Sequence, residues 1–112
     1  AGTYTYTGLF AASYRSLNPA TEYGSFTMSA DFSAKRISFI GKTATFQLNG
    51  NAVLDSNAGT FNSNAFTFSY FNYNYPASIY GLMGGNGATA TSGVFHTNDY
   101  NVDYAGAFVG HR

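Results

Sequence analysis

The chain has 112 residues, of which five are basic and five acidic, and it contains no cysteine. This length predicts a single domain spanning residues 1–112. A net charge of zero excludes the basic surface with which proteins bind nucleic acid or anionic membranes. The lack of cysteine excludes disulfides and thiol chemistry.

Aromatic residues and glycine dominate the composition, with ten Tyr, eleven Phe and thirteen Gly against two Pro. Such a composition favours β structure, in which rings fill the interior and glycines form bends. Alternation of apolar and polar residues predicts strands along the chain, and no segment has the apolar spacing of a helix. In chain order, we expect strands at 4–10, 26–33, 36–41, 44–48, 52–54, 66–70, 79–83, 89–96 and 104–111.

Turn-forming residues separate these segments. We expect a tight hairpin at 33–35, a second at the Asn-Gly pair of 49–51, a third turn at 55–59 and a flexible one at 84–87. Asn18-Pro19 marks a longer first loop. About eight strands in this order predict an all-β, closed antiparallel up-and-down barrel filled by side chains. Outward positions rich in Thr, Ser, Gln and Asn favour a soluble barrel that does not span a membrane.

The parity of the alternation predicts which side chains face the barrel interior. The clearest segment is 26–33, where apolar residues occupy the even positions and polar residues the odd ones. The expected interior residues are Phe26, Met28, Phe32, Phe46, Leu48, Phe66 and Phe68.

An aromatic run at 70–76 is the strongest indication of a binding surface. If the parity of Phe66 and Phe68 continues, Asn72 and Asn74 point inward, and three rings occupy the outward positions. These partner-binding candidates are Phe71, Tyr73 and Tyr75. Exposed rings on a sheet face usually mark an interaction site. The alternatives are that a bulge near Tyr70 returns the rings to the core, or that a further domain covers them.

His96 is the histidine with the more interesting surroundings, because Tyr100 and Tyr104 follow it closely. Histidine and tyrosine both serve as axial ligands of haem iron, so these three residues form a candidate haem site. The alternative is a rim histidine satisfied by water or backbone. His111 lies one residue from the end of the sequence and carries no prediction.

Catalytic and metal-binding motifs are weak. The run from Asp99 to Asp103 places oxygen ligands at alternating positions, but it lacks the glycine and the later glutamate of a calcium loop. An Asn- and Asp-rich hairpin loop that caps its own backbone explains it better. No nucleophile elbow, inward-facing carboxylate pair or phosphate loop is present. We therefore expect no resident metal and no enzyme activity.

Two short motifs resemble those of a known family. At 29–39, Asp31 and Phe32 end one strand, Lys35 lies in the turn, and Ile37 and Ser38 begin the next strand. In the final hairpin, the matching residues are Gly93, Phe95, Asp103, Gly106 and Phe108. The pattern resembles the small β-barrel domain of the transferrin-binding-protein-B-like surface proteins of Gram-negative bacteria. The sequence departs from that pattern at Phe39, His96, Thr97, Asn98 and Ala105.

This resemblance implies a non-enzymatic binding barrel at the bacterial cell surface or in secreted form. Members of the family capture host iron proteins, bind haem or bind other host proteins. A haem carrier using His96 or a tyrosine, and a scaffold without a ligand of its own, are the alternatives. Larger members carry a strand-rich handle domain before the barrel, so the resemblance also implies a longer precursor. Residues 1–4 lack the features of a signal peptide, and we expect a mature form or an excised domain.

Overall fold

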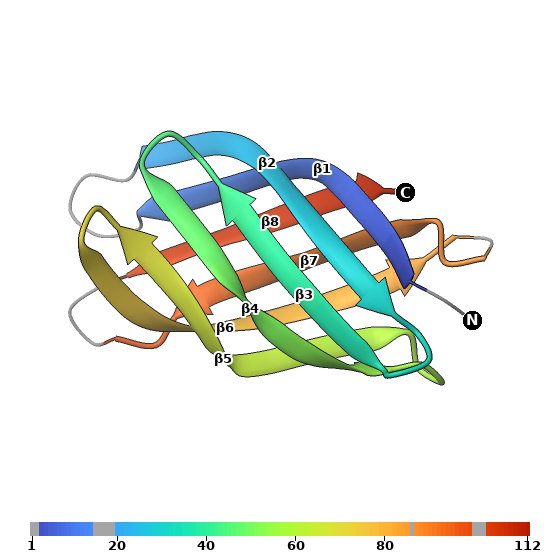
Figure 1. Cartoon of the computed structure of the whole chain (residues 1–112). Coiled ribbons are helices and arrows are strands. Elements are labelled where there is room, and N and C mark those ends of the chain that lie inside the picture. Colours follow the sequence, from blue (N-terminus) through green and yellow to red (C-terminus); the bar gives the residue numbers. More distant parts are fainter. Residues whose placement is uncertain (1–2, 15–19, 86, 100–102) are drawn as a thin grey trace.

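The computed structural model describes residues 3–14, 20–85, 87–99 and 103–112. Each strand pairs with its neighbours in sequence, and β8 pairs with β1, so the sheet closes into an antiparallel barrel (Figure 1). The predicted fold class is therefore confirmed. The strands are β1 (Thr3–Tyr14), β2 (Ala20–Asp31), β3 (Arg36–Lys42), β4 (Phe46–Asp55), β5 (Thr60–Tyr70), β6 (Tyr73–Gly84), β7 (Ala90–Thr97) and β8 (Tyr104–His111).

The barrel is elongated, with principal extents of 44 × 22 × 21 Å, and its two ends differ. Figure 1 shows the ends of β1, β3, β5 and β7 on the left, and both chain termini on the right. Among the described residues, no helix is long and apolar enough to cross a membrane.

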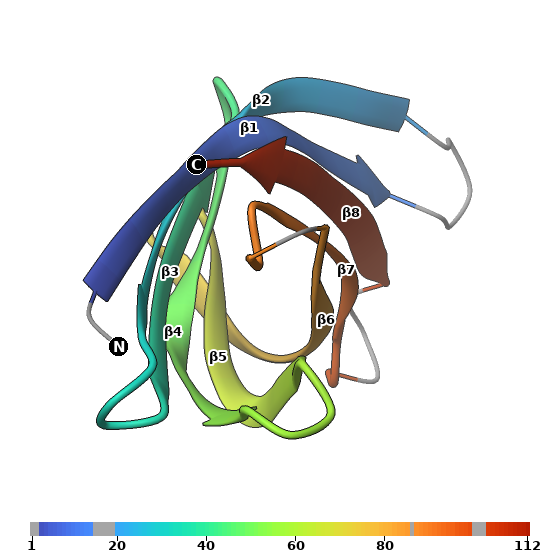
Figure 2. The same cartoon turned by 90° about the vertical axis from the view of Figure 1, so that its right-hand side faces the viewer.

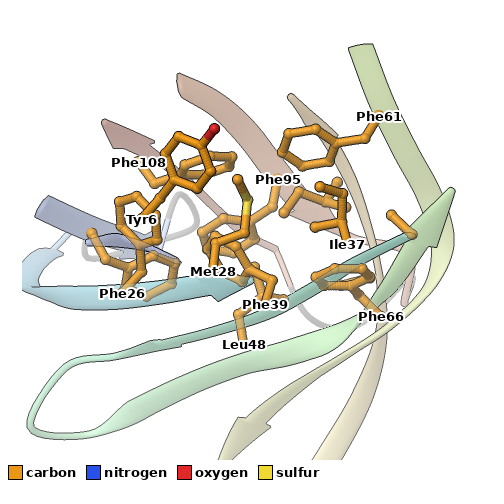
Figure 3. Close-up of a cluster of buried hydrophobic side chains, with 14 of the residues drawn as sticks. Tyr6, Phe26, Met28, Ile37, Phe39, Leu48, Phe61, Phe66, Phe95 and Phe108 are labelled. Carbon is orange, nitrogen blue, oxygen red and sulfur yellow. The ribbon is translucent and has the colours of Figure 1, made fainter. Parts of the chain in front are cut away.

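A single aromatic core fills the barrel (Figure 3). Five of the seven predicted interior residues are fully buried: Phe26, Met28, Leu48, Phe66 and Phe68. The other two, Phe32 and Phe46, are partly buried and pack against this core near its ends. Neighbouring rings contact one another along the core, for example Phe26 and Phe39 with ring centroids 5.3 Å apart. Strand parity was therefore a sound guide to the interior.

Glycines make room for these rings. Gly93 of β7 lies directly opposite Phe108 of β8, and Phe95 lies opposite Gly106. A Cβ atom at Gly93 would lie 2.5 Å from the Phe108 ring, and one at Gly106 would lie 2.3 Å from the Phe95 ring. Each strand thus supplies the ring that covers the glycine of the other, an arrangement that stabilises glycine within a sheet. In the two Gly-x-Phe segments of this strand pair, at 93–95 and 106–108, glycine thus serves the packing of the rings.

The Asn-Gly pair at 49–51 does not form a hairpin, so that prediction is wrong. Gly50 lies within β4, opposite Phe39 of β3. A Cβ atom at Gly50 would lie 2.6 Å from the Phe66 ring, so glycine is required here for packing. From Phe46 on, the expected short segments at 44–48 and 52–54 consequently belong to one continuous strand, and residues 44 and 45 lie in the preceding turn.

A β-bulge interrupts β5. The register with β6 shifts between Ser63 and Phe66, so that Asn64 and Ala65 lie opposite the single residue Ser78. The extra residue changes the parity, which places both Phe61 and Phe66 inside the barrel although they are five positions apart. The observed strand β5 begins at Thr60, six residues before the start predicted from the alternation, which the bulge interrupts.

Candidate functional site: an aromatic mouth at one end of the barrel

Five partly buried rings converge at the end of the barrel where β1 and β5 finish and β4 and β8 begin. They are Tyr14, Phe46, Tyr70, Tyr75 and Tyr104, here called the aromatic mouth. Each ring continues the inward parity of its strand to this end, beyond the fully buried core. The mouth is therefore the exposed edge of the core, and it is rich in tyrosine hydroxyl groups.

Tyr104 is the centre of the mouth. Its ring centroid lies 4.8 Å from that of Phe68, 4.9 Å from that of Phe46 and 5.0 Å from that of Tyr14. Tyr70 lies farther away, at 6.4 Å. Burial raises the pKa of the Tyr104 hydroxyl, and the nearby Tyr70 hydroxyl raises it further. The phenol therefore stays protonated at neutral pH and can donate a hydrogen bond.

Glu22 fixes the turn beside the mouth. Its carboxylate accepts hydrogen bonds from the hydroxyls of Thr43, at 2.6 Å, and Thr45, at 2.7 Å, and from the Thr45 backbone N–H, at 3.1 Å. These bonds, the one from the Thr43 hydroxyl first, lower the pKa of Glu22. An ionised carboxylate from β2 thus holds the β3–β4 turn in place next to Phe46.

The three predicted partner-binding rings occupy different environments. Phe71 is 73% exposed and Tyr73 is 63% exposed, so both form the rim of the mouth. Tyr75 is partly buried, pairs with Phe68 and packs against the core. The expectation that Tyr75 occupies the outer face is therefore wrong.

The cause is the tight turn between β5 and β6. Tyr70 pairs with Tyr73, so only Phe71 and Asn72 connect the strands and the parity is reset. The prediction that Asn72 and Asn74 point inward is wrong as well. Both are exposed, and the Asn74 side chain accepts a hydrogen bond at 2.7 Å from the hydroxyl of Ser69 on the outer face.

Phe71 adopts an unusual backbone conformation for a bulky residue, with φ at 54°. This left-handed region favours glycine and asparagine and is costly for a large side chain. Burial of the ring does not offset this strain, because the ring remains largely exposed. It contacts Tyr70 of the mouth, with the ring centroids 4.4 Å apart. Retained strain of this kind is characteristic of functional positions.

The candidate haem ligands do not converge. His96 is exposed and follows the buried Phe95, so it faces outward, whereas Tyr104 faces the interior. One iron cannot contact both side chains across the sheet. Tyr100 lies outside the described residues. Haem binding through one of these residues alone stays a prediction, tested by haemin titration of the wild type and of His96→Ala.

The opposite end of the barrel, here called the closed end, is covered in part by the chain itself. The described residues of the β6–β7 connection lie over part of the opening (Figure 2), and the Tyr6 hydroxyl donates a hydrogen bond to the Ala88 carbonyl. Arg112 donates from Nη2 to the Gly87 carbonyl at 2.7 Å, and its guanidinium lies 4.1 Å from the centroid of the Tyr4 ring. Among the described residues, no segment lies over the ring-lined end in this way, and that end suits recognition.

The chemistry available at the mouth is that of contact surfaces and hydrogen bonds. Within the described ranges, no group of three or more His, Cys, Asp or Glu side chains is placed to hold a metal ion. The mouth offers apolar ring surface, phenol hydroxyls and one carboxylate. Tyrosine is well suited to protein recognition because it combines large area with little side-chain entropy.

Sequence reasoning missed most of the mouth. Tyr14, Tyr70 and Glu22 were not singled out, and Phe46 was expected only as a core residue. A usable signal existed, because hairpin order brings the ends of β1, β5 and β7 to the same end of a barrel. Tyrosines at such strand ends could have been grouped on that basis.

Comparison with solved structures identifies the same barrel in larger proteins. Transferrin binding protein B from serogroup B Neisseria meningitidis superposes over 100% of this chain with a TM-score of 0.77 and 14% identity. A mutant of the Haemophilus parasuis protein of the same name covers 98% with a TM-score of 0.75 and 19% identity. The N-lobe domain of lactoferrin binding protein B from Moraxella bovis covers 98%, with a TM-score of 0.74 and 17% identity.

The predicted resemblance is thus confirmed as a shared fold. This chain spans about a quarter of the length of the two transferrin binding protein B chains and 59% of the lactoferrin binding protein B domain. No protein-family model and no curated protein sequence matches the chain. The similar structures are binding proteins by name, and none of these names describes an enzyme.

Proposed function

We propose that this barrel is a non-enzymatic recognition domain that binds a host iron-carrying protein through the aromatic mouth and its rim. The observation that carries the proposal is Phe71, a bulky ring held exposed in a strained turn at the accessible end of the barrel. Tyr73 is a second exposed ring close to Phe71 in the chain, and the Tyr104 hydroxyl at the centre of the mouth can donate a hydrogen bond. Clusters of this composition form the energetic centre of many protein interfaces.

The class of partner rests on the shared fold. The solved barrels that superpose on this chain belong to proteins named for binding transferrin and lactoferrin. A partner of that class, and a location at the bacterial cell surface or outside the cell, follow as part of the proposal. A partner protein also suits the geometry, because side chains fill the barrel interior while Phe71 and Tyr73 are largely exposed at its end.

The test uses a substitution that removes the Phe71 ring while relieving its strain. Phe71→Asn places a residue tolerant of left-handed backbone in the turn, so the barrel should unfold at the same or a higher denaturant concentration. Binding to immobilised transferrin or lactoferrin, measured by biolayer interferometry, should weaken by roughly tenfold or more, as for other interface anchors. Combining it with Tyr73→Ser should weaken binding further.

The matched control is Val53→Ser, which alters a residue on β4 that is 70% exposed and lies away from the mouth. It should leave the affinity unchanged. Equal affinities of Phe71→Asn, the double variant and the wild type would contradict a role for the rim. A wild type that binds neither iron protein would contradict the proposed partner class.

A further inference from the structure

The outer wall of the barrel carries an apolar band that is separate from the aromatic mouth. It runs across β2, β1, β8 and β7 in two adjacent rows of outward-facing side chains. Its members are Leu9, Ala11, Tyr23, Val94, Ala107 and Val109. The strand register makes the band continuous, because Ala11 pairs with both Tyr23 and Ala107, and Leu9 pairs with Val109.

The large members of the band are strongly exposed. Tyr23 is 75% exposed, Leu9 65%, Val109 56% and Val94 54%. No band residue is charged. The rows on its two sides carry Ser13 and Thr21, hydrogen-bonded to each other at 2.7 Å, and Thr7 and Thr27, whereas on β6 the exposed Tyr80 lies opposite Val94 and extends the apolar surface. A contiguous apolar patch with a polar border is the usual form of a protein interaction surface.

The band has a protruding side chain, Tyr23, here called the knob, next to a shallow groove. Ala11 and Ala107 form the floor of a shallow groove of about 250 Å³, with Leu9, Tyr23 and Val109 as its walls. Tyr23 is the most exposed wall residue. Two copies related by a two-fold axis would bring the same patch against itself, so each Tyr23 ring could enter the groove of the other copy.

We propose that this band is the interface of a homodimer. The six residues present roughly 500–600 Å² per copy, most of it from Tyr23, Leu9, Val94 and Val109, given that a large ring alone offers about 150–250 Å². Two copies that covered all of this surface would bury roughly 1,000–1,200 Å², which is the range of weak, transient interfaces. Because the chain has a net charge of zero, a second copy also meets no net electrostatic repulsion. The dimer is weak and depends on concentration.

Sedimentation velocity of the 112-residue chain tests the proposal. Between about 5 and about 500 µM, where an interface of this size associates, the weight-average mass should rise from 12.0 kDa toward twice that value. Ala107→Arg fills the groove with a charged side chain, and Tyr23→Ser removes the knob. Both variants should remain monomeric throughout this range, with melting temperatures close to that of the wild type.

The matched control is Val53→Arg, which places the same charge on an exposed apolar residue outside the band and should dimerise like the wild type. The chain has no cysteine, so Val109→Cys provides a second measurement. It should form a disulfide-linked dimer under mild oxidation much faster than Val53→Cys. A wild type that stays monomeric, or equal cross-linking of the two cysteine variants, would overturn the proposal. Because the band lies apart from Phe71 and Tyr73, Ala107→Arg should still bind any partner of the mouth.

Discussion

The two ends of the barrel use the same kinds of residue in opposite ways. At the closed end, side chains are paired within the chain. The Tyr6 hydroxyl donates a hydrogen bond to the Ala88 carbonyl, and Arg112 donates one to the Gly87 carbonyl while its guanidinium lies over the Tyr4 ring. At the mouth, the rings contact one another but remain partly exposed, and Phe71 and Tyr73 are largely exposed. Aromatic content alone does not mark a binding surface. What distinguishes the mouth is that its rings are left without a covering segment among the described residues.

The strongest test of this contrast compares one phenylalanine from each half. Phe61 is 1% exposed in the half nearer the closed end, whereas Phe46 is only partly buried at the mouth. Phe61→Ala should lower the free energy of unfolding by about 3–5 kcal/mol. Phe46→Ala should lower it by about half as much, because less of its surface leaves water on folding. Urea unfolding followed by circular dichroism measures both, and equal losses would mean that the mouth is packed as tightly as the core.

A smaller effect distinguishes the hydroxyl groups of the two ends. Tyr6→Phe leaves the Ala88 carbonyl without its donor and should lower the free energy of unfolding by about 1–2 kcal/mol. Tyr73→Phe alters an exposed rim residue and should change it by less than about 0.5 kcal/mol. The same urea measurements apply. A loss for Tyr73→Phe as large as that for Tyr6→Phe would show that the rim is structural.

The smallest effect concerns pH at the mouth. The folded protein holds the pKa of Glu22 below the ordinary value of 4.5, chiefly through the hydrogen bond from Thr43. The folded state therefore binds fewer protons than the unfolded state, and Glu22 stabilises the fold above pH 4.5. This contribution is lost as the pH falls through the lowered pKa. Glu22→Gln should thus be less stable than the wild type at neutral pH, by less than Tyr6→Phe.

Thermal melts from neutral to acidic pH would show this difference. The gap between the wild type and Glu22→Gln should be constant at neutral pH and close below pH 4.5. A gap that widens on acidification would contradict the role of the Glu22 carboxylate in holding the turn at Thr43 and Thr45.

Local sequence determined the fold class and much of the core. In a strand, successive side chains point to opposite faces, so the alternation at 26–32 fixed the inner and outer faces of β2. The same argument placed Leu48, Phe66 and Phe68 inside the barrel, as observed. Phe71 and Tyr73 are exposed, as expected, but because they lie in and next to the β5–β6 turn at the end of the barrel, since Tyr73 belongs to the same row of β6 as the partly buried Tyr75. Hairpin order, together with a strand count near eight, was enough to predict closure of the barrel.

Tertiary structure decided the features that depend on contacts between strands. Parity cannot be carried through a two-residue turn or a bulge, so Tyr75 and Phe61 were placed only by their strand pairing. Gly50 carries the strongest local turn signal but serves to admit the Phe66 ring, which comes from another strand. The mouth unites residues from five strands, and the apolar band unites four. Neither grouping is visible along the chain, because barrel closure brings together side chains that are distant in sequence.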